Sequence, residues 1–498
     1  MTTTEITILS CYFAVLVVLA IYGLHRYVLM YLYFKYKDRV PVPQGCFAEP
    51  PLVTVQLPIF NEMYVVTRLI EAVCRMDYPR DRLEIQVLDD STDETQQIAQ
   101  AAVERYRAQG YDIHYLHRPD RLGFKAGALD FGMQRARGEF LAIFDADFVP
   151  APEILRSTID YFTDPQVGMV QVRWGHINRD FSILTQVQSI FLDGHFVLEH
   201  GARNRSGRFF NFNGTAGVWR RSCIGASGGW QHDTLTEDLD LSYRAQLKGW
   251  HFVFLPQIVS PAELPVEMNA FKTQQHRWAK GSIQTGKKLI PSLLRSRLPW
   301  TVKLEALFHL TNNAAYLLMI ALSLLMFPAM AIRVKMGWSK TLIIDLPIFL
   351  LASASFSSFY FCAQREIYAD WKKRLKYIPF LMSLGMGLSV NNAKAVLEAL
   401  LGFDTEFRRT PKYRIESNRD QWKDKRYRGQ IDMLVLIELA LGIYFSVTLY
   451  FAIVSGLYFS IPFIILFQVG FLYTAMLSLL QLGHRWRFER RQAASSRA

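Results

Sequence analysis

The chain has 498 residues, of which 51% are hydrophobic and 14% aromatic. This composition excludes an ordinary soluble protein of the same size, so part of the chain is expected to lie in lipid. The formal net charge of +12 sits largely beside the apolar runs, which favours contact with anionic lipid headgroups over binding to nucleic acid.

The first apolar run, residues 6–24, is close to the length of about 20 residues that crosses a bilayer. No basic residue precedes it, four basic residues follow it between positions 26 and 39, and no small-residue cleavage site is present. Residues 1–34 are therefore expected to be a transmembrane anchor and not a signal peptide. The positive-inside rule predicts that the chain after this anchor is cytoplasmic.

Residues 50–290 are expected to form one globular domain. Short β-rich runs at 52–58, 83–90, 111–117, 139–147 and 167–172 alternate with helix-like segments at 62–76, 93–108, 124–136 and 152–162. This alternation predicts an α/β domain on a mostly parallel sheet. Such sheets bind ligands beyond the carboxyl ends of their strands. The five scattered cysteines show neither metal-ligand nor disulfide spacing, which agrees with a reducing cytoplasmic compartment.

Two pairs of acidic residues close predicted strands. Asp89 and Asp90 end the second run, and Asp145 and Asp147 end the fourth in "IFDADF". Carboxylates at i and i+2 of an extended chain point to the same side, so both could approach one hard cation such as Mg²⁺ or Mn²⁺. Either pair alone is as well explained by helix capping. Together they favour a nucleotide-diphosphate site, where a metal would neutralise the diphosphate and help it leave.

A third acidic motif lies in "TLTEDLDLSYRAQLKGW", which begins at Thr234. Thr236 is a plausible N-cap, with Glu237 and Asp238 in the first helical turn, and stabilisation by the helix dipole would account for these acids if they stood alone. Displacement of a diphosphate by a sugar hydroxyl, however, needs a base to remove the hydroxyl proton. Asp238 is the candidate base.

Four more apolar runs follow, near 308–332, 341–362, 431–454 and 457–480, with an ambiguous stretch at 377–401. If that stretch spanned, segment 403–429 with its nine Lys/Arg and the basic tail 482–498 would both lie outside. We therefore expect five spans, with 389–401 an amphipathic helix at the cytoplasmic surface. The expected divisions are an interfacial segment 291–302, two spans in 303–362, the amphipathic helix and a basic loop in 377–429, two spans in 430–481, and the tail.

In order, the motifs are Asp-Asp, Asp-x-Asp, Thr-Glu-Asp and then Gln-x-x-Arg-Trp in "QQHRW" (274–278). This combination resembles the processive family 2 glycosyltransferases, the group of cellulose, hyaluronan and chitin synthases. The stretches "FFNFNGTAGVWR" (209–220) and "TEDLDLSYRAQLKGWHFVFLP" (236–256) are most similar to the plant cellulose-synthase-like A and C proteins, which make mannan or glucan backbones. The resemblance covers roughly residues 50–420 and implies a GT-A-type, Rossmann-like domain inserted between transmembrane helices.

The resemblance implies roles for the acidic motifs and one lysine. Asp89 and Asp90 would contact the uridine or guanosine base and ribose. Asp145 would lie near the nucleotide and the metal, with Asp147 on the metal, and Lys125 would lie near the donor diphosphate. Asp238 would be the general base, with Glu237 beside the acceptor.

Further roles follow for the later motifs. Gln274 and Arg277 would hold sugar hydroxyls and the donor diphosphate, and Trp278 would seat the acceptor sugar, although an Arg/Trp pair also marks many membrane-edge helices. The loop holding Asn213, Gly214 and Thr215 would face the acceptor; many family members have cysteine at the position of Asn213. "FRRTPK" resembles the family's gating loop through Phe407, Thr410 and Lys412, with Arg409 in place of its valine.

The implied activity is inverting transfer of a hexose from a nucleotide-diphosphate sugar, UDP-glucose or GDP-mannose, to a β-linked chain that the spans would carry across the membrane. The alternative is a non-processive glycolipid synthase that adds one hexose to diacylglycerol or ceramide. A non-catalytic nucleotide sensor or a transport protein fits less well, because every acidic motif is present. Expected partners are the donor, the glycan or lipid acceptor, and membrane lipid.

Overall fold

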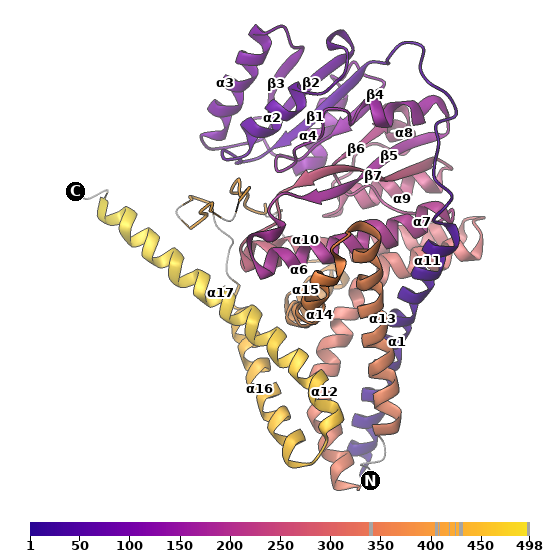
Figure 1. Cartoon of the computed structure of the whole chain (residues 1–498), viewed down its shortest axis with the longest axis vertical. Coiled ribbons are helices and arrows are strands. Elements are labelled where there is room, and N and C mark those ends of the chain that lie inside the picture. Colours follow the sequence, from indigo (N-terminus) through magenta and orange to yellow (C-terminus); the bar gives the residue numbers. More distant parts are fainter. Residues whose placement is uncertain are drawn as a thin grey trace.

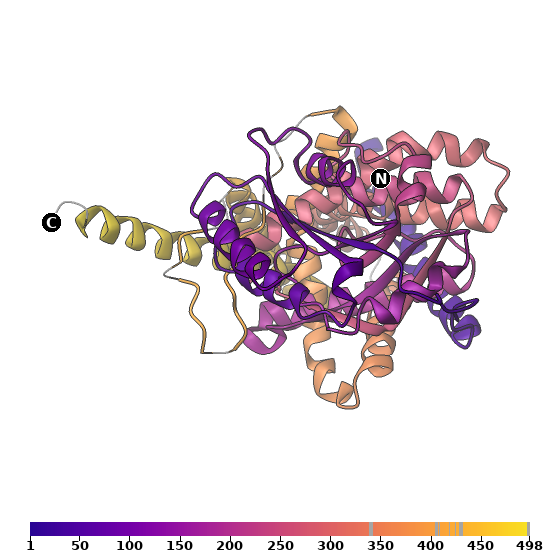
Figure 2. The ribbon, with the colours of Figure 1, turned by 90° about the horizontal axis from the view of Figure 1, so that it is seen from above.

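The computed structural model describes residues 1–337, 342–403, 407, 409–417, 419–423, 425–427 and 432–495. A domain built on a β-sheet sits on one end of a bundle of long helices (Figure 1). Viewed from above, the sheet domain covers that end of the bundle, and the C-terminal end of the last helix extends away from both (Figure 2). The structure therefore consists of a globular part and an apolar helical part, as predicted.

The described residues form one sheet of seven strands in the order β3-β2-β1-β4-β6-β5-β7. Pairs β1/β2, β1/β4, β2/β3 and β5/β7 are parallel, whereas β6 runs antiparallel to both β4 and β5. The five predicted strands are present, and the last two below were not predicted. The strands are β1 Val53–Ile59, β2 Leu83–Asp89, β3 Ile113–His117, β4 Phe140–Ile143, β5 Val167–His176, β6 Gly217–Arg220 and β7 His251–Ala262.

Hydrophobic side chains cover both faces of the sheet. In β4, Phe140 and Ala142 point into one core with α2 and α3, whereas Leu141 and Ile143 point into the other with α4, α8 and α9. This is the period of two that a strand buried on both faces requires. The domain helices are α2 Val66–Cys74, α3 Thr95–Ala108, α4 Phe124–Met133, α5 Arg156–Ile159, α6 Ile183–Asp193, α7 Gly201–Arg205, α8 Arg221–Ala226 and α9 Glu237–Leu247.

The topology brings several loops to one edge of the sheet. The parallel strands β1, β2 and β4 all end there, so the residues that follow them converge. Because β6 is antiparallel to β4, with Gly217 opposite Ile143, it is the start of β6 that reaches this edge. Its preceding loop, which holds Asn213 and Gly214, therefore faces the acidic residues after β4.

Four helical stretches among the described residues are long and apolar enough to cross a membrane: Thr3–Tyr36, Trp300–Lys335, Leu434–Val454 and Tyr458–Gln481. They correspond to four of the five predicted spans. The fifth, 341–362, falls on α13, which runs beside α1 but is not among these four, and residue 341 lies outside the described residues. The bundle helices are α1 Thr3–Tyr36, α10 Met268–Arg295, α11 Trp300–Thr311, α12 Ala315–Lys335, α13 Leu342–Ile367, α14 Ile378–Gly387, α15 Ser389–Leu401, α16 Leu434–Val454 and α17 Ile461–Ser495.

The ambiguous stretch forms two short helices, α14 and α15, and the second has the predicted bounds of 389–401. α15 packs against α10 and α12, and α14 packs against α17. Close approach of α14 and α17 depends on Gly387 and Gly470, since a Cβ on Gly387 would lie 2.3 Å from the Gly470 carbonyl oxygen. α15 is therefore a packed element of the bundle and not a helix lying free on a surface.

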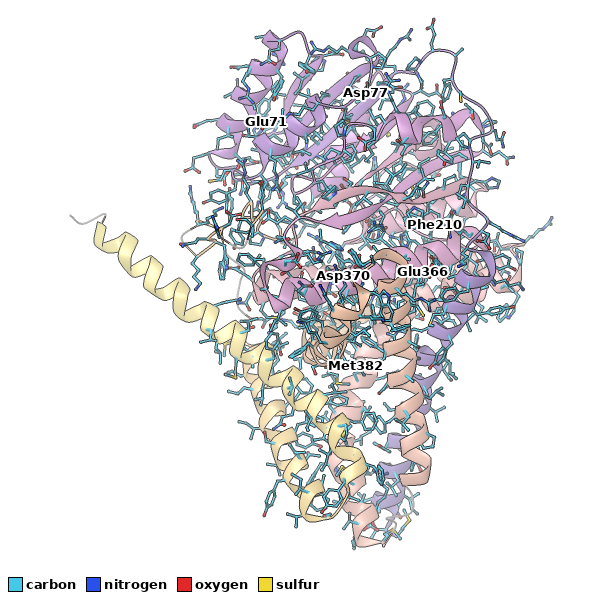
Figure 3. All side chains as sticks on the ribbon, in the orientation of Figure 1. Glu71, Asp77, Phe210, Glu366, Asp370 and Met382 are labelled. Atoms are coloured by element: carbon cyan, nitrogen blue, oxygen red, sulfur yellow. The ribbon has the colours of Figure 1, made fainter. Side chains whose placement is uncertain are left out.

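Helix α10 joins the two parts of the molecule. Lys272 Nζ lies 2.6 Å from Glu438 Oε2 of α16 and 2.9 Å from Ser478 Oγ of α17. Figure 3 places Glu366 and Asp370 at the level where the sheet domain meets the bundle, Met382 within the bundle, and Glu71 and Asp77 in the part of the domain far from it. Buried polar contacts thus fix the domain to the apolar helices.

Candidate active site

A cavity of about 1070 Å³, including its solvent-open part, lies at the edge of the sheet where the parallel strands end. It is bounded by the loops after β1, β2 and β4, the loop before β6, the start of α9, one face of α10, residue 407 and residues 409–412. The predicted site residues that line it are Asp90, Lys125, Asp145, Asp147, Asn213, Gly214, Glu237, Asp238, Gln274, Arg277, Trp278, Phe407, Arg409, Thr410 and Lys412.

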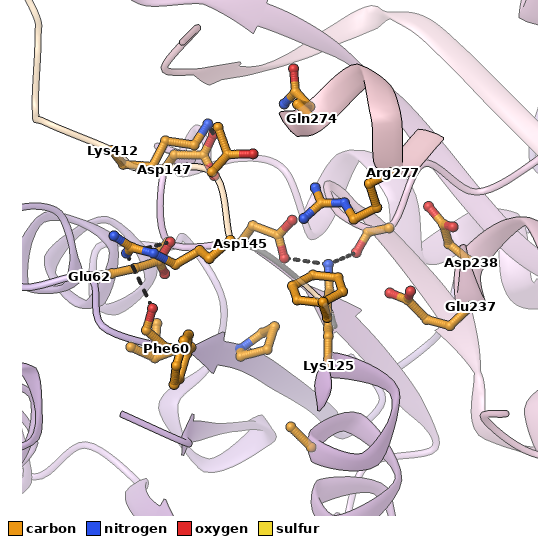
Figure 4. A pocket seen from close by; sticks show the side chains of 18 of the residues that line it. Phe60, Glu62, Lys125, Asp145, Asp147, Glu237, Asp238, Gln274, Arg277 and Lys412 are labelled. Carbon is orange, nitrogen blue, oxygen red and sulfur yellow. Dashed lines mark hydrogen bonds and ion pairs between the residues drawn. The ribbon is translucent and has the colours of Figure 1, made fainter. Parts of the chain in front are cut away.

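The two carboxylates of the Asp-x-Asp motif each contact a lysine. Lys125 Nζ lies 2.5 Å from Asp145 Oδ1 and donates to the Gly214 carbonyl at 2.8 Å. Lys412 Nζ lies 2.5 Å from Asp147 Oδ2 (Figure 4). Burial raises the pKa of Asp145 in spite of the Lys125 ammonium. Both acidic groups are thus neutralised by ammonium groups of the chain itself.

The Asp-x-Asp pair fits a hard divalent cation. Two carboxylates facing one cavity supply oxygen ligands, and Mg²⁺ is commonly bound by one or two carboxylates together with substrate phosphates. Among the described residues no group of three or more His, Cys, Asp or Glu side chains is arranged to hold a metal. Asp145 and Asp147 would hold such a cation jointly with a diphosphate, which it would neutralise as it leaves.

Glu237 and Asp238 lie at the start of α9, on the far side of Lys125 from Asp147 (Figure 4). Burial, and then the neighbouring Glu237 carboxylate, raises the pKa of Asp238 to about 7. Burial also raises the pKa of Glu237. A carboxylate with a pKa near neutrality is a better proton acceptor than an ordinary aspartate, which suits a general base.

One face of α10 carries the Gln-x-x-Arg-Trp motif into the cavity. Gln274, Arg277 and Trp278 all line it, and Figure 4 shows Gln274 and Arg277 on the same helix above the acidic residues. The Arg277 guanidinium lies 4.7 Å from the centre of the Phe407 ring. Burial lowers the pKa of Arg277, so the cavity holds a desolvated cation between the acidic groups and the bundle.

The Asn213 amide is fixed by two histidines from outside the cavity. Its Nδ2 donates to His195 Nε2 at 3.0 Å, and its Oδ1 accepts from His200 Nε2 at 2.7 Å. Both histidines lie in the π-helical segment Gly194–His200. His195 Nδ1 in turn contacts Glu199 at 2.9 Å. The side chain on the acceptor-side loop is therefore held in one orientation.

This network continues into the membrane helices. Arg203 Nη1 donates to Glu199 Oε2 at 3.3 Å, and its Nε donates to Glu305 Oε1 at 3.0 Å. Glu305 Oε2 lies 2.9 Å from His25 Nε2 of α1. No sequence motif indicated this network, because its members come from four separate segments of the chain.

Phe407, Arg409, Thr410 and Lys412 form one wall of the cavity. Arg409 Nη1 donates to the carbonyls of Phe60 and Asn61, and its guanidinium lies 4.3 Å from the centre of the Tyr427 ring. The Thr410 hydroxyl is buried and has no hydrogen-bond partner among the described residues. Where the family pattern has valine, the arginine thus ties this wall to the loop after β1.

Three residues that were predicted to contact the donor or the acceptor are engaged with other protein groups in the structure. Asp89 is fully buried and accepts from the Ser91 amide and the Tyr115 hydroxyl, so it holds the loop and does not line the cavity. Thr215 is also fully buried, and its hydroxyl accepts from the Asp145 amide at 2.9 Å. Asp90 lines the cavity but is paired with Arg118 at 2.7 and 2.5 Å.

Sequence reasoning missed several residues of the cavity wall. Glu62 lies 3.6 Å from Arg409, and burial, with Asp147 and Asp145 nearby, raises the pKa of Glu62 to about 8. The Arg121 guanidinium lies 3.4 Å from the centre of the Phe60 ring. A signal for Glu62 was available, because it follows β1 as Asp145 follows β4.

Comparison with known proteins agrees with this geometry. Residues 50–281 match the sequence model described as "Glycosyltransferase like family 2". This match covers slightly less than half of the chain. The matched region and the apolar helices on either side of it confirm the predicted fold class and the predicted resemblance to the cellulose-synthase-like group.

Two plant relatives are similar to half of the chain. "Glucomannan 4-beta-mannosyltransferase 2" of Arabidopsis thaliana is 42% identical over 252 residues, which is 50% of this chain and 47% of that protein. "Glucomannan 4-beta-mannosyltransferase 1" of Oryza sativa subsp. japonica is 43% identical over 252 residues, 50% of this chain and 48% of that protein. The chain spans about half the length of the curated relatives it matches.

A solved structure shares the fold. A mannosyltransferase from Pyrobaculum calidifontis, in complex with GDP-Man and Mn²⁺, aligns with a TM-score of 0.51 at 20% sequence identity. The alignment covers 78% of this chain and 99% of that one. This likeness supports the GT-A-type fold of the sheet domain.

Proposed function

We propose that the protein is a membrane-embedded inverting glycosyltransferase that moves mannose from GDP-mannose to a growing β-linked glycan. The observation that carries this proposal is that Asp147, Asp238 and Trp278, which come from separate parts of the chain, line one cavity. GDP-mannose is favoured over UDP-glucose because the plant relatives are named as glucomannan mannosyltransferases. The catalytic domain is proposed to face the cytoplasm, where nucleotide sugars are available.

The donor would bind with its diphosphate between the Asp-x-Asp motif and the cationic groups. A divalent metal, when bound, would neutralise the diphosphate. Lys412 and Arg277 approach this region from opposite sides (Figure 4), and a guanidinium fork matches phosphate oxygens. Preorganised cations of this kind stabilise the charge that develops on a leaving group, which is commonly the largest contribution to catalysis.

Asp238 would act on the acceptor. Its carboxylate takes the proton of the acceptor hydroxyl, the hydroxyl oxygen forms the new bond to C1 of the hexose, and the bond from C1 to the diphosphate breaks on the opposite side. A single displacement of this kind turns an α-linked donor into a β-linked product. Trp278, which lines the same cavity as Asp238, would offer a flat apolar face for the acceptor ring.

The test incubates the purified protein in lipid nanodiscs with radiolabelled GDP-mannose or UDP-glucose, and with Mn²⁺ or Mg²⁺. The proposal expects label from GDP-mannose in an ethanol-insoluble polymer that endo-β-mannanase degrades. Label in a single-hexose lipid would support the glycolipid alternative instead. Asp238→Asn is the matched control, and export of the polymer is tested separately by its accessibility to mannanase outside sealed vesicles.

A further inference from the structure

A second cavity adjoins the active site. It is bounded by the start of α4, the loop before α9, and Gln284, which lies two helical turns beyond Arg277 on α10. Its volume is about 310 Å³, at the lower end of the usual range of about 300–1,000 Å³ for small-ligand pockets. We call it the side pocket and define it by Phe124, His232, Thr234, Glu237, Gln284 and Phe407.

The side pocket presents a polar group without a partner among the described residues. The Thr234 hydroxyl is buried, at 7% exposure of the residue, and has no hydrogen-bond partner in the described part of the chain. Glu237, which also lines the side pocket, is 8% exposed. A buried hydroxyl without a partner costs roughly 1–3 kcal/mol, so its presence at a cavity wall points to a ligand that supplies the missing hydrogen bond.

The wall also contains an aromatic surface held in an unusual conformation. The Phe124 and Phe407 rings are stacked with centroids 5.5 Å apart. Phe124 has a φ of 51°, in the left-handed region that bulky residues rarely adopt. The preceding Gly123 also has positive φ, and its Cα faces the His232 ring, which a Cβ would approach to 3.1 Å. Strain of this kind is typical of functional sites.

The side chains that line the side pocket indicate the class of ligand. Lys125 reaches the side pocket but is committed to Asp145 and the Gly214 carbonyl. Asp233 is paired with Lys288 at 2.8 Å, and Lys125 and Arg277 partly offset the charge of the Glu237 carboxylate. A neutral polyhydroxyl ring suits the combination of an aromatic surface with carboxylate, imidazole, amide and hydroxyl groups.

We propose that the side pocket is a second saccharide subsite, which takes a neutral hexose unit of the acceptor glycan next to the catalytic cavity. Glu237, Leu235 and Phe407 line both cavities, so a bound oligosaccharide can extend from one into the other. The inference rests on the proposed function for the identity of the glycan. It places part of that glycan away from Trp278.

The test measures binding of β-1,4-linked mannotriose to the full chain in nanodiscs by saturation-transfer NMR, in an Asp238→Asn background so that no turnover occurs. The Thr234→Val exchange keeps the side-chain shape and removes only the hydroxyl. We expect it to weaken mannotriose binding by about tenfold, while thermal stability is unchanged or higher because a buried unpaired group is removed. His232→Ala and Gln284→Ala should also weaken binding.

Unchanged mannotriose affinity in both Thr234→Val and His232→Ala would overturn the inference, as would binding that depends on Trp278 alone or the absence of any binding. GDP-mannose binding is measured on the same samples. The two ligands are measured separately. If the side-pocket inference is wrong, mannotriose binding is unaffected by the variants while GDP-mannose still binds. If the proposed donor is wrong, GDP-mannose does not bind, and the mannotriose measurement still tests the side pocket.

Discussion

Lys412 Nζ lies 2.5 Å from Asp147 Oδ2, on one of the two carboxylates that would hold the proposed metal. Both side chains are buried, with exposures of 6% and 8%. The ammonium group therefore compensates the charge of Asp147 when no cation is bound. Binding of a metal must displace it or share the carboxylate with it.

Replacing Lys412 by methionine should raise the affinity of the donor-free protein for Mn²⁺, because the competing ammonium is gone. We expect about a tenfold increase, or ~1.4 kcal/mol, measured by electron paramagnetic resonance of free Mn²⁺. Lys394→Met is the matched control, since Lys394 makes an ion pair of the same 2.5 Å length with Asp432 outside the cavity. Equal Mn²⁺ affinity in wild type and Lys412→Met would show that the lysine does not compete with the metal.

The pKa of Asp238, raised to about 7, predicts the pH dependence of the reaction. A general base acts only when deprotonated, so kcat/KM should be low at pH 5.5, rise as the pH approaches 7 and level off above it. Glu237→Gln removes a neighbouring negative charge that favours protonation of Asp238, so the rising limb should move to lower pH. A pH–rate profile that is flat between pH 5.5 and 8 would exclude Asp238 as the base.

The parts of the fold set by local sequence were predictable. β1 to β5 and the helices between them carry the alternation of an α/β domain, and the acidic residues after β2 and β4 marked the edge that binds ligands. β6 was missed because it has only four residues and is stabilised by pairing with β4 and β5, which are distant in the sequence. β7, which was also missed, pairs with the distant β5.

The placement of individual acids could not be predicted. Asp89 and Asp90 are adjacent in the sequence, yet one is fully buried against Tyr115 and the other is paired with Arg118 at the cavity wall. Which acid turns inward depends on partners from β3 and the loop after it. The same reason applies to Glu62, whose significance comes from Arg409, a residue almost 350 positions later in the chain.

Removing the Asn213 side chain should affect the acceptor and leave the donor unaffected. Asn213→Ala removes the partner of His195 Nε2 and one of the two partners of His200 Nε2, which keeps the Asn211 carbonyl, and this loss should lower the free energy of unfolding by about 1–3 kcal/mol. We also expect a higher KM for an oligosaccharide acceptor, with the KM for GDP-mannose unchanged. Asn204→Ala is the control, because Asn204 bonds to the backbone at Phe252 and Phe254 away from the cavity. If both variants change the acceptor KM equally, Asn213 has only a structural role.

The buried pair Lys272–Glu438 should hold α10 to the last two helices. Glu438 is fully buried, so Glu438→Gln leaves the buried Lys272 ammonium without a compensating carboxylate and should destabilise the protein by about 3–5 kcal/mol. The double variant Lys272→Met with Glu438→Leu should recover much of this loss, because neither charge remains. Thermal unfolding in detergent reports both effects. A single variant as stable as the wild type would contradict this anchoring role.

The central claim is that one cavity joins a metal-bound donor to a base that acts on the acceptor. The most direct measurement is Mn²⁺-dependent binding of GDP-mannose by calorimetry, combined with release of GDP, for Asp147→Asn and Asp238→Asn. The account predicts that Asp147→Asn loses at least about tenfold in donor affinity. It predicts that Asp238→Asn binds the donor normally and loses about 10²–10⁴-fold in turnover. Normal donor binding by Asp147→Asn, or normal turnover by Asp238→Asn, would contradict it.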